Sequence, residues 1–368
     1  MLGARRRLLL LAGLFAVGVI LCSHAVFLST LRPGVTSPHG WYGGVDQHKY
    51  LVEAEDLARG DLPRRAEYLY GLGYPAAAVP ALKLGFVGDP FTPFDVLAFG
   101  AMLTMTAVLG ERLHSLRLGV LAALALAVAT PALSAMAMPW NTTVSVLAGL
   151  AGLLVATAPR PPSWRQGLVL GLAVGVCFAA RYVDALFPLA VGGAGLLRWG
   201  RRARPAAVAA GAATLVLVGA VLWTHAAVLG SPLTTPYASR GRAHSEQSLS
   251  GYRLADVPRH GLEVFVTGND DGKRTGTDPL LARFPWAVLA PAGAVLLLRR
   301  RHPLRGPLLV AAAMSIAFTV LYLAFPAGGG HDLVYGNQRY FLMQFPLWAV
   351  LAGISVAALL DRAPSGRE

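Results

Sequence analysis

The chain has 368 residues, of which 55% are hydrophobic and only 14% are charged. A soluble domain carries about a quarter charged residues, so this composition argues against one and indicates a polytopic membrane protein. The net charge of +13 does not indicate nucleic-acid binding, because the arginines stand in small groups between apolar runs rather than on one basic face.

Ten apolar runs approach the length of about 20 residues that a membrane-spanning helix needs. We therefore expect an all-α polytopic membrane protein with about ten spans, folded as a single integral membrane domain over residues 1–368. The expected spans are 8–31, 93–110, 117–137, 142–158, 166–181, 184–198, 206–229, 283–299, 306–326 and 340–360. The first run is too long for an ordinary signal peptide, so we expect it to remain as an uncleaved span.

The orientation follows from the basic residues, because Lys and Arg favour cytoplasmic loops. With the N-terminus inside, nearly every inner connection is basic, and the acidic residues inside are Glu111, Asp361 and Glu368. We therefore expect a cell-membrane protein with both termini in the cytoplasm. The short apolar stretch 70–86 contains two prolines and would reverse this pattern if it crossed the membrane. We interpret it as interfacial or re-entrant.

Three segments remain outside the cytoplasm in this arrangement, namely 32–92, 230–282 and 327–339. No inner connection is comparable, so we expect the active site of the protein on the extracytoplasmic side. The segment 230–282 is too long for a connector and is expected to cap a cavity. Its paired Asp270 and Asp271 are suited to a divalent cation, but their Gly-rich surroundings are more typical of a turn. No cofactor is predicted.

A cluster of carboxylates follows the first apolar run, in the stretch GGVDQHKYLVEAEDLARG (43–60). From Lys49 to Leu57 its apolar residues recur at helical spacing, which predicts a helix on the membrane surface, with Asp46 on the approach to its N-terminus. Two glycines before Asp46 allow the tight turn that would bring this carboxylate to the mouth of a cavity. Asp46 is therefore a candidate functional residue, and the alternative is a solvated or helix-capping residue. The other acids are expected to form a solvated face: Glu53, Glu55, Asp56 and Asp61.

Two arginines depart from the positive-inside pattern. Arg181 and Arg339 stand at the expected outer ends of spans, where an unpartnered arginine costs free energy. An arginine offers positive charge and hydrogen-bond donors to an anionic group, so both are candidates for substrate binding. A plain salt bridge between Arg181 and Asp184 is the alternative. Tyr340 is either an interfacial aromatic residue or a ring that contacts the substrate.

In their order along the chain, these pieces resemble the GT-C membrane glycosyltransferases. That superfamily includes protein O-mannosyltransferases, aminoarabinose transferases and bacterial lipopolysaccharide sugar transferases. The matching pieces are Asp46, Tyr50 and AEDLARG, then YLYGLGYPAAAVPAL, RYVDALFPLAV, GSPLTTPY and NQRYFLMQFPLWAVLAG. The sequence departs from the common pattern at Gln47, where many relatives have a second acid.

The resemblance implies a polyprenyl-phosphate-linked sugar donor and an inverting transfer, with Asp46 as the general base on the acceptor hydroxyl. The expected partners are this lipid-linked donor, an extracytoplasmic glycan, lipid or protein acceptor, and membrane lipids, with no nucleic acid. Beside Asp46, the candidate substrate-binding residues include His48, Lys49 and Tyr50.

A transporter or flippase for a lipid-linked or polar solute is the competing hypothesis. A transporter favours charges or broken helices near the middle of the membrane, together with repeat symmetry. The centres of the expected spans are nearly free of ionisable residues, and the polar residues gather in outer segments. The sequence therefore favours an enzyme.

Overall fold

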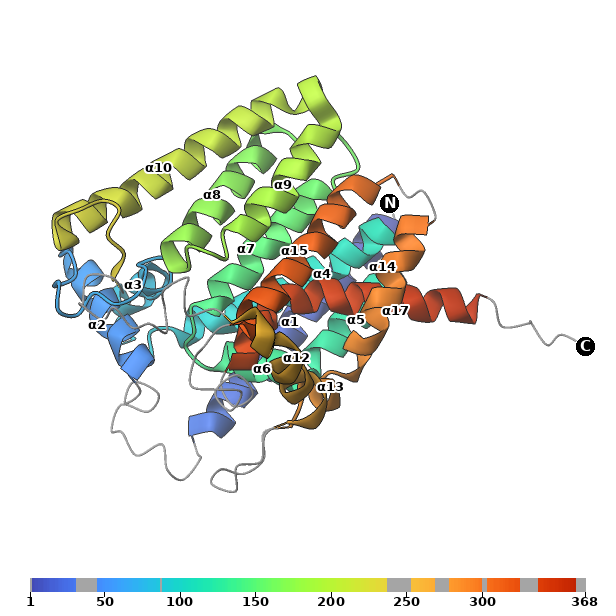
Figure 1. Ribbon diagram of the computed structural model, residues 1–368, viewed down its shortest axis with the longest axis horizontal. Helices are drawn as coiled ribbons and strands as arrows, with labels where there is room; N and C mark the ends of the chain where they lie inside the picture. Colours follow the sequence, from blue (N-terminus) through green and yellow to red (C-terminus); the bar gives the residue numbers. More distant parts are fainter. Residues whose placement is uncertain are drawn as a thin grey trace, which may run out of the picture.

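The computed structural model describes residues 2–30, 45–86, 88–236, 253–268, 278–299, 303–324 and 337–361, and all regular structure in them is helical (Figure 1). The α-helices are α1 (Leu2–Thr30), α2 (Val45–Arg59), α3 (Pro75–Lys83), α4 (Thr92–Leu113), α5 (Leu116–Ala127), α6 (Thr130–Ala137), α7 (Thr142–Ala156), α8 (Trp164–Ala180), α9 (Leu186–Trp199), α10 (Arg204–Leu229), α12 (Val257–Leu262), α13 (Leu280–Arg283), α14 (Ala290–Arg299), α15 (Arg305–Leu323) and α17 (Phe345–Leu360). Shorter turns of other helical types are η2 (Gly200–Ala203), η4 (Leu254–Asp256), η5 (Glu263–Thr267), η6 (Pro285–Leu289) and η7 (Asn337–Gln344).

Each of the ten expected spans is occupied by helix, but fewer than ten helices are long enough to cross a membrane. Within the described residues, five stretches have the length and apolar character of a span: Ala4–Leu28, Thr92–Leu113, Leu186–Leu229, Arg305–Leu323 and Gln338–Leu360. The third contains two of the expected spans, because α9 and α10 follow each other through η2. The pair α5 and α6, bent by 65°, gives a sixth if it is one span. The chain therefore has the character of a multi-pass membrane protein. Among the described residues, five or six stretches have the length of a span, fewer than the ten expected.

The remaining expected spans are shorter helices. Thr142–Ala156, Trp164–Ala180 and Pro285–Arg299 are apolar but have 10–17 residues. Helix α8 stops where Arg181 takes an extended conformation. The bend between α5 and α6 precedes Pro131, whose ring would clash with the carbonyl of Ala127, the last residue of α5, if that helix continued.

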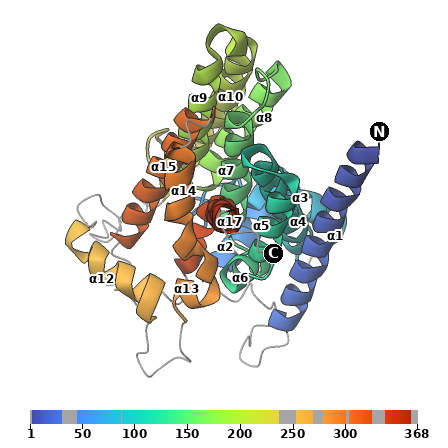
Figure 2. The same cartoon turned by 90° about the vertical axis from the view of Figure 1, so that its right-hand side faces the viewer.

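The helices pack closely through small residues, as is common among membrane helices. On α8, a Cβ added at Gly167 or Gly171 would lie 2.0 or 2.3 Å from the carbonyl oxygens of Ala206 and Ala210 on α10. Figure 2 shows α17 end-on near the middle of the molecule, and this helix packs against α14, α5 and α4. Because η7 leads directly into α17 and packs on α7, its residues are fixed by the core.

The described part of the first expected outer segment folds into α2, α3 and the chain between them. Figure 1 places α2 and α3 at the left edge, whereas the N-terminal end of α1 lies on the right. The stretch 70–86 contains only the nine-residue α3, as expected for a segment that does not cross. On the other side of the bundle, the guanidinium of Arg7 donates two hydrogen bonds of 2.8 Å to the carboxylate of Glu111.

Candidate active site

Four of the residues singled out in the sequence lie together in the structure. Asp46 is in the first turn of α2, Arg339 and Tyr340 are in η7, and Arg181 follows the last turn of α8. Arg339 Nη2 lies 3.8 Å from Asp46 Oδ2, although the two residues stand near opposite ends of the chain. The guanidinium carbons of Arg181 and Arg339 lie 4.7 and 5.1 Å from the centroid of the Tyr340 ring.

The Asp46 carboxylate is held but not enclosed. The Tyr70 hydroxyl donates a hydrogen bond to Oδ1, while Oδ2 faces Arg339, and 29% of the side chain is exposed. An ionised carboxylate offers about four acceptor positions, so these two neighbours leave room for a third group. The carboxylate can therefore accept a proton from a hydroxyl that approaches from the exposed side.

Arg339 is supported by aromatic rings. Its guanidinium lies 3.3 Å from the centroid of the Trp140 ring, and Nη2 lies 3.5 Å from the Tyr340 hydroxyl. The side chain is 13% exposed, so the rings replace much of the water around the charge. An arginine on an aromatic face keeps its donors in a fixed plane. This geometry is suited to binding an anionic group such as a phosphate.

Arg181 forms an ion pair with Asp184, which the sequence analysis gave as the alternative to substrate binding. Its Nε lies 2.8 Å from Asp184 Oδ2, and its Nη2 donates a hydrogen bond of 3.0 Å to the Tyr322 hydroxyl. The Tyr322 hydroxyl in turn donates to Asp184. Much of the donor capacity of Arg181 is thus used inside the protein, which makes Arg339 the better phosphate-binding candidate.

Tyr340 lies between the two arginines and also stacks on Tyr322, with ring centroids 5.1 Å apart and ring planes inclined by 12°. The structure therefore places Tyr340 in a stack of rings and guanidinium groups. Trp140, Tyr70 and Tyr322 were missed in the sequence, because aromatic residues are common at membrane borders and nothing in the local pattern distinguishes these three.

The other three candidates follow Asp46 on α2. His48 is exposed, and the Lys49 ammonium forms an ion pair with Glu67. Tyr50 is 2% exposed, and its ring packs against Tyr70, the hydrogen-bond donor to Asp46, at a centroid distance of 4.9 Å. The assignment of these three residues to substrate binding stays a prediction.

The expectation that the remaining acids are solvated was wrong for two of them. Asp61 is exposed, but Glu53 and Asp56 are 0% and 5% exposed. Glu53 Oε1 accepts hydrogen bonds from the backbone N–H groups of Leu69 and Tyr70, at 3.0 and 3.3 Å. A buried carboxylate needs such donors, since desolvation without them is costly. Glu53 therefore attaches the chain after α2 to the helix itself.

The YGLGYP motif owes its glycines to close contact with α8. A Cβ added at Gly71 would lie 2.0 Å from the carbonyl oxygen of Ala179, and Gly73 donates its backbone N–H to the same oxygen at 2.9 Å. The end of α8 is also held by Asn141, whose amide donates to the Ala180 carbonyl at 3.3 Å. These contacts place the motif beside Arg181 and bring the first outer segment to the cluster.

Among the described residues, no group of three or more His, Cys, Asp and Glu side chains gathers in a way that suits a metal ion. Asp270 and Asp271 lie outside the described residues.

No protein-family model and no curated protein matches the sequence. The fold is similar to that of ArnT from Cupriavidus metallidurans bound to undecaprenyl phosphate, with a TM-score of 0.61 and 16% identity over 95% of this chain and 60% of that chain. It is also similar to the archaeal oligosaccharyltransferase AglB from Archaeoglobus fulgidus in complex with an inhibitory peptide and a dolichol-phosphate. There the TM-score is 0.58 and the identity 12%, over 95% of this chain and 50% of that chain. The chain spans about half to three fifths of the length of these proteins, and it has the fold of GT-C membrane glycosyltransferases.

Proposed function

We propose that this protein is a membrane glycosyltransferase that moves a sugar from a polyprenyl-phosphate-linked donor to an acceptor hydroxyl outside the cytoplasm. One observation carries the proposal: a partly exposed carboxylate, Asp46, lies 3.8 Å from Arg339, a cation supported by aromatic rings. A general base and an anion-binding group side by side are what a transfer from a sugar phosphate needs.

The proposed reaction assigns each residue a step. Asp46 takes the proton of the acceptor hydroxyl while the acceptor oxygen forms a bond to the anomeric carbon. The bond between that carbon and the phosphate oxygen breaks, and its electron pair leaves with the polyprenyl phosphate. Arg339 stabilises the charge that develops on this phosphate. Attack on the face opposite the phosphate inverts the anomeric configuration.

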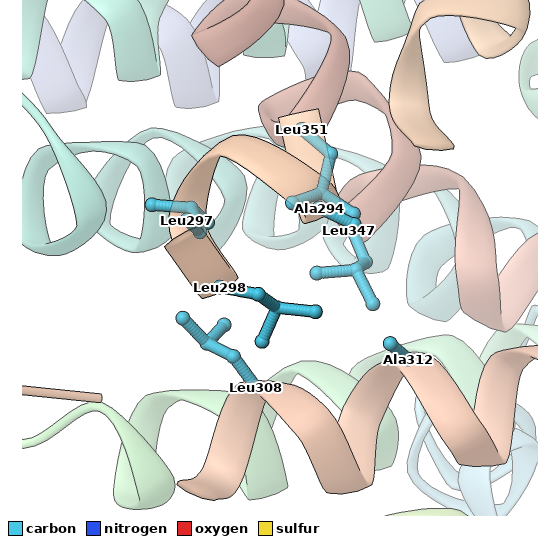
Figure 3. A pocket seen from close by; sticks show the side chains of 7 residues that line it. All are labelled: Ala294, Leu297, Leu298, Leu308, Ala312, Leu347 and Leu351. Atoms are coloured by element: carbon cyan, nitrogen blue, oxygen red, sulfur yellow. The ribbon is translucent and has the colours of Figure 1, made fainter. Parts of the chain in front are cut away.

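An apolar groove next to the cluster is suited to the lipid chain of such a donor. A groove of about 440 Å³ runs between α14, α15 and α17, and its residues Thr319 and Val320 lie within one turn of Tyr322 on α15. Next to it, Leu297, Leu308 and Leu347 line a second and much smaller pocket, which is wholly aliphatic (Figure 3). From Ala312 to Val320, the ends of the groove on α15, the helix rises about 12 Å, which is enough for the first isoprene units of such a chain.

The fold neighbours support the same class of donor, since one of the similar structures holds undecaprenyl phosphate and another holds dolichol-phosphate. The bent pair α5 and α6 is the kind of broken helix that favours a transporter, but the similar structures that hold undecaprenyl phosphate and dolichol-phosphate favour the enzyme.

The proposal is tested with purified protein in liposomes and a panel of undecaprenyl-phosphate hexoses and pentoses. Asp46→Asn keeps the shape of the side chain and removes its basicity, so transfer should fall by about 10²–10⁴-fold. Glu55→Gln, a matched change in the same helix, should leave transfer unchanged. Near-normal turnover by folded Asp46→Asn protein would rule out the mechanism.

A further inference from the structure

We infer that Tyr70 and Glu53 are positioning residues that hold the Asp46 carboxylate in its reactive orientation. This inference rests on the proposed function and adds to it two residues that touch no substrate atom. The observation behind it is that Tyr70 contacts α2 twice, through its backbone N–H at Glu53 and through its hydroxyl at Asp46.

The two acids lie on one face of α2. Asp46 and Glu53 are seven residues apart, which is close to two full turns and about 10 Å along the helix axis. Tyr70 lies along this face, with its main chain at one acid and its phenol at the other. A residue bound at both ends in this way fixes the distance and direction from which its hydroxyl meets Asp46.

Tyr70 is also restrained from its other sides. Its ring packs against Tyr50, which is itself in edge contact with Tyr74 at a centroid distance of 5.3 Å. The next residue, Gly71, leaves no space for a side chain against the Ala179 carbonyl. These contacts fix the main chain of Tyr70 and one side of its ring, and so favour the position in which the hydroxyl meets Asp46.

The hydrogen bond from Tyr70 matters for a general base because it keeps Oδ1 of Asp46 away from Arg339. Without it, both carboxylate oxygens are able to turn to the guanidinium, and such a two-point pair would occupy the base and the phosphate-binding group at once.

Glu53 acts through Tyr70. It is fully buried and accepts the N–H groups of Leu69 and Tyr70 at one oxygen. A glutamine keeps an acceptor oxygen at this place, whereas an alanine removes it and leaves two N–H groups without their acceptor. Rescue by the conservative replacement therefore separates the acceptor role of Glu53 from any role of its charge.

The test measures kcat/KM with the undecaprenyl-phosphate sugar that the parent protein turns over. Tyr70→Phe keeps the ring and removes the hydroxyl, so kcat/KM should fall by about tenfold, the equivalent of one lost hydrogen bond. The matched control is Tyr74→Phe, in the same aromatic cluster, because its hydroxyl donates to Asp95 instead, at 2.7 Å. This control should keep the kcat/KM of the parent.

The Glu53 variants give a second measurement that does not depend on Tyr70→Phe. Glu53→Ala should lower kcat/KM as Tyr70→Phe does, while Glu53→Gln should keep the parent value. A kcat/KM unchanged in both Tyr70→Phe and Glu53→Ala, with Asp46→Asn inactive, overturns the inference and leaves the proposed function standing. Full activity of Asp46→Asn overturns both.

Discussion

Arg339 is shared between the base and the expected phosphate. It lies 3.8 Å from Asp46, a separation at the long end of an ion pair, and its guanidinium is held mainly by the Trp140 and Tyr340 rings. A phosphate that binds Arg339 therefore meets a cation that is already in place and only weakly engaged by the carboxylate. Arg181 differs, because its charge is paired with buried Asp184.

This difference predicts that loss of Arg339 affects lipid binding, whereas loss of Arg181 affects stability. Arg339→Ala should weaken the binding of undecaprenyl phosphate by about 10–100-fold, the equivalent of a charged hydrogen bond, and Arg339→Lys should weaken it less. Arg181→Ala should instead lower the thermal stability, because it leaves Asp184 as an uncompensated buried charge. Lipid binding by native mass spectrometry and thermal unfolding in detergent measure the two effects. Equal lipid binding by Arg339→Ala and the parent would contradict the assignment.

Part of the cluster was predictable from the sequence. Arg181 and Arg339 were found because they break the charge pattern of a membrane protein, and Asp46 because of its place before an amphipathic helix. Glu53 was misread for a physical reason. It stands three residues after Tyr50 and four before Leu57, which is the spacing of the buried face, but a carboxylate is rarely buried without donors. Those donors come from residues 69 and 70, and no local pattern shows that contact.

At the scale of helices, apolar runs located the elements well and their breaks less well. All ten expected runs are helical, but the run 117–137 is divided into α5 and α6. Helices α7 and α8 have 15 and 17 residues, close to their apolar runs and short of the about 20 that a span needs. Hydropathy responds to apolar content and not to where a backbone must stop. The turns next to these helices are also the ones that contribute Trp140 and Arg181 to the cluster.

The contact between the YGLGYP motif and α8 gives a prediction at this scale. Gly71→Ala would place a Cβ 2.0 Å from the Ala179 carbonyl oxygen, so the motif and α8 must separate, at a cost of about 1–3 kcal/mol. We expect a lower unfolding temperature and a loss of transfer.

The matched control is Gly219→Ala in α10, where an added Cβ meets nothing within 4 Å and alanine favours the helix. This variant should be as stable as the parent. A Gly71→Ala protein with the unfolding temperature of the parent would show that the two segments do not pack as described.

For the whole molecule, the function depends on which end of the helix bundle carries the cluster around Asp46. The ion pair between Arg7 and Glu111 puts the start of α1 and the end of α4 at one end of the bundle. The cluster around Asp46 lies with α2, and Figure 1 shows α2 at the opposite end from the start of α1. If the basic end faces the cytoplasm, as the arginines indicate, the carboxylate and the arginines of the cluster face outward, where the proposed acceptor is found.

This orientation is testable by cysteine labelling in intact cells. The two native cysteines, Cys22 and Cys177, are fully buried, so they should give little background. A cysteine at exposed Asp61, just after α2, should react with a membrane-impermeant maleimide added outside. A cysteine at exposed Arg202, between α9 and α10, should react only after the cells are opened. Outside labelling at Arg202 together with protection at Asp61 would reverse the topology and place Asp46 on the cytoplasmic side, away from the proposed acceptor.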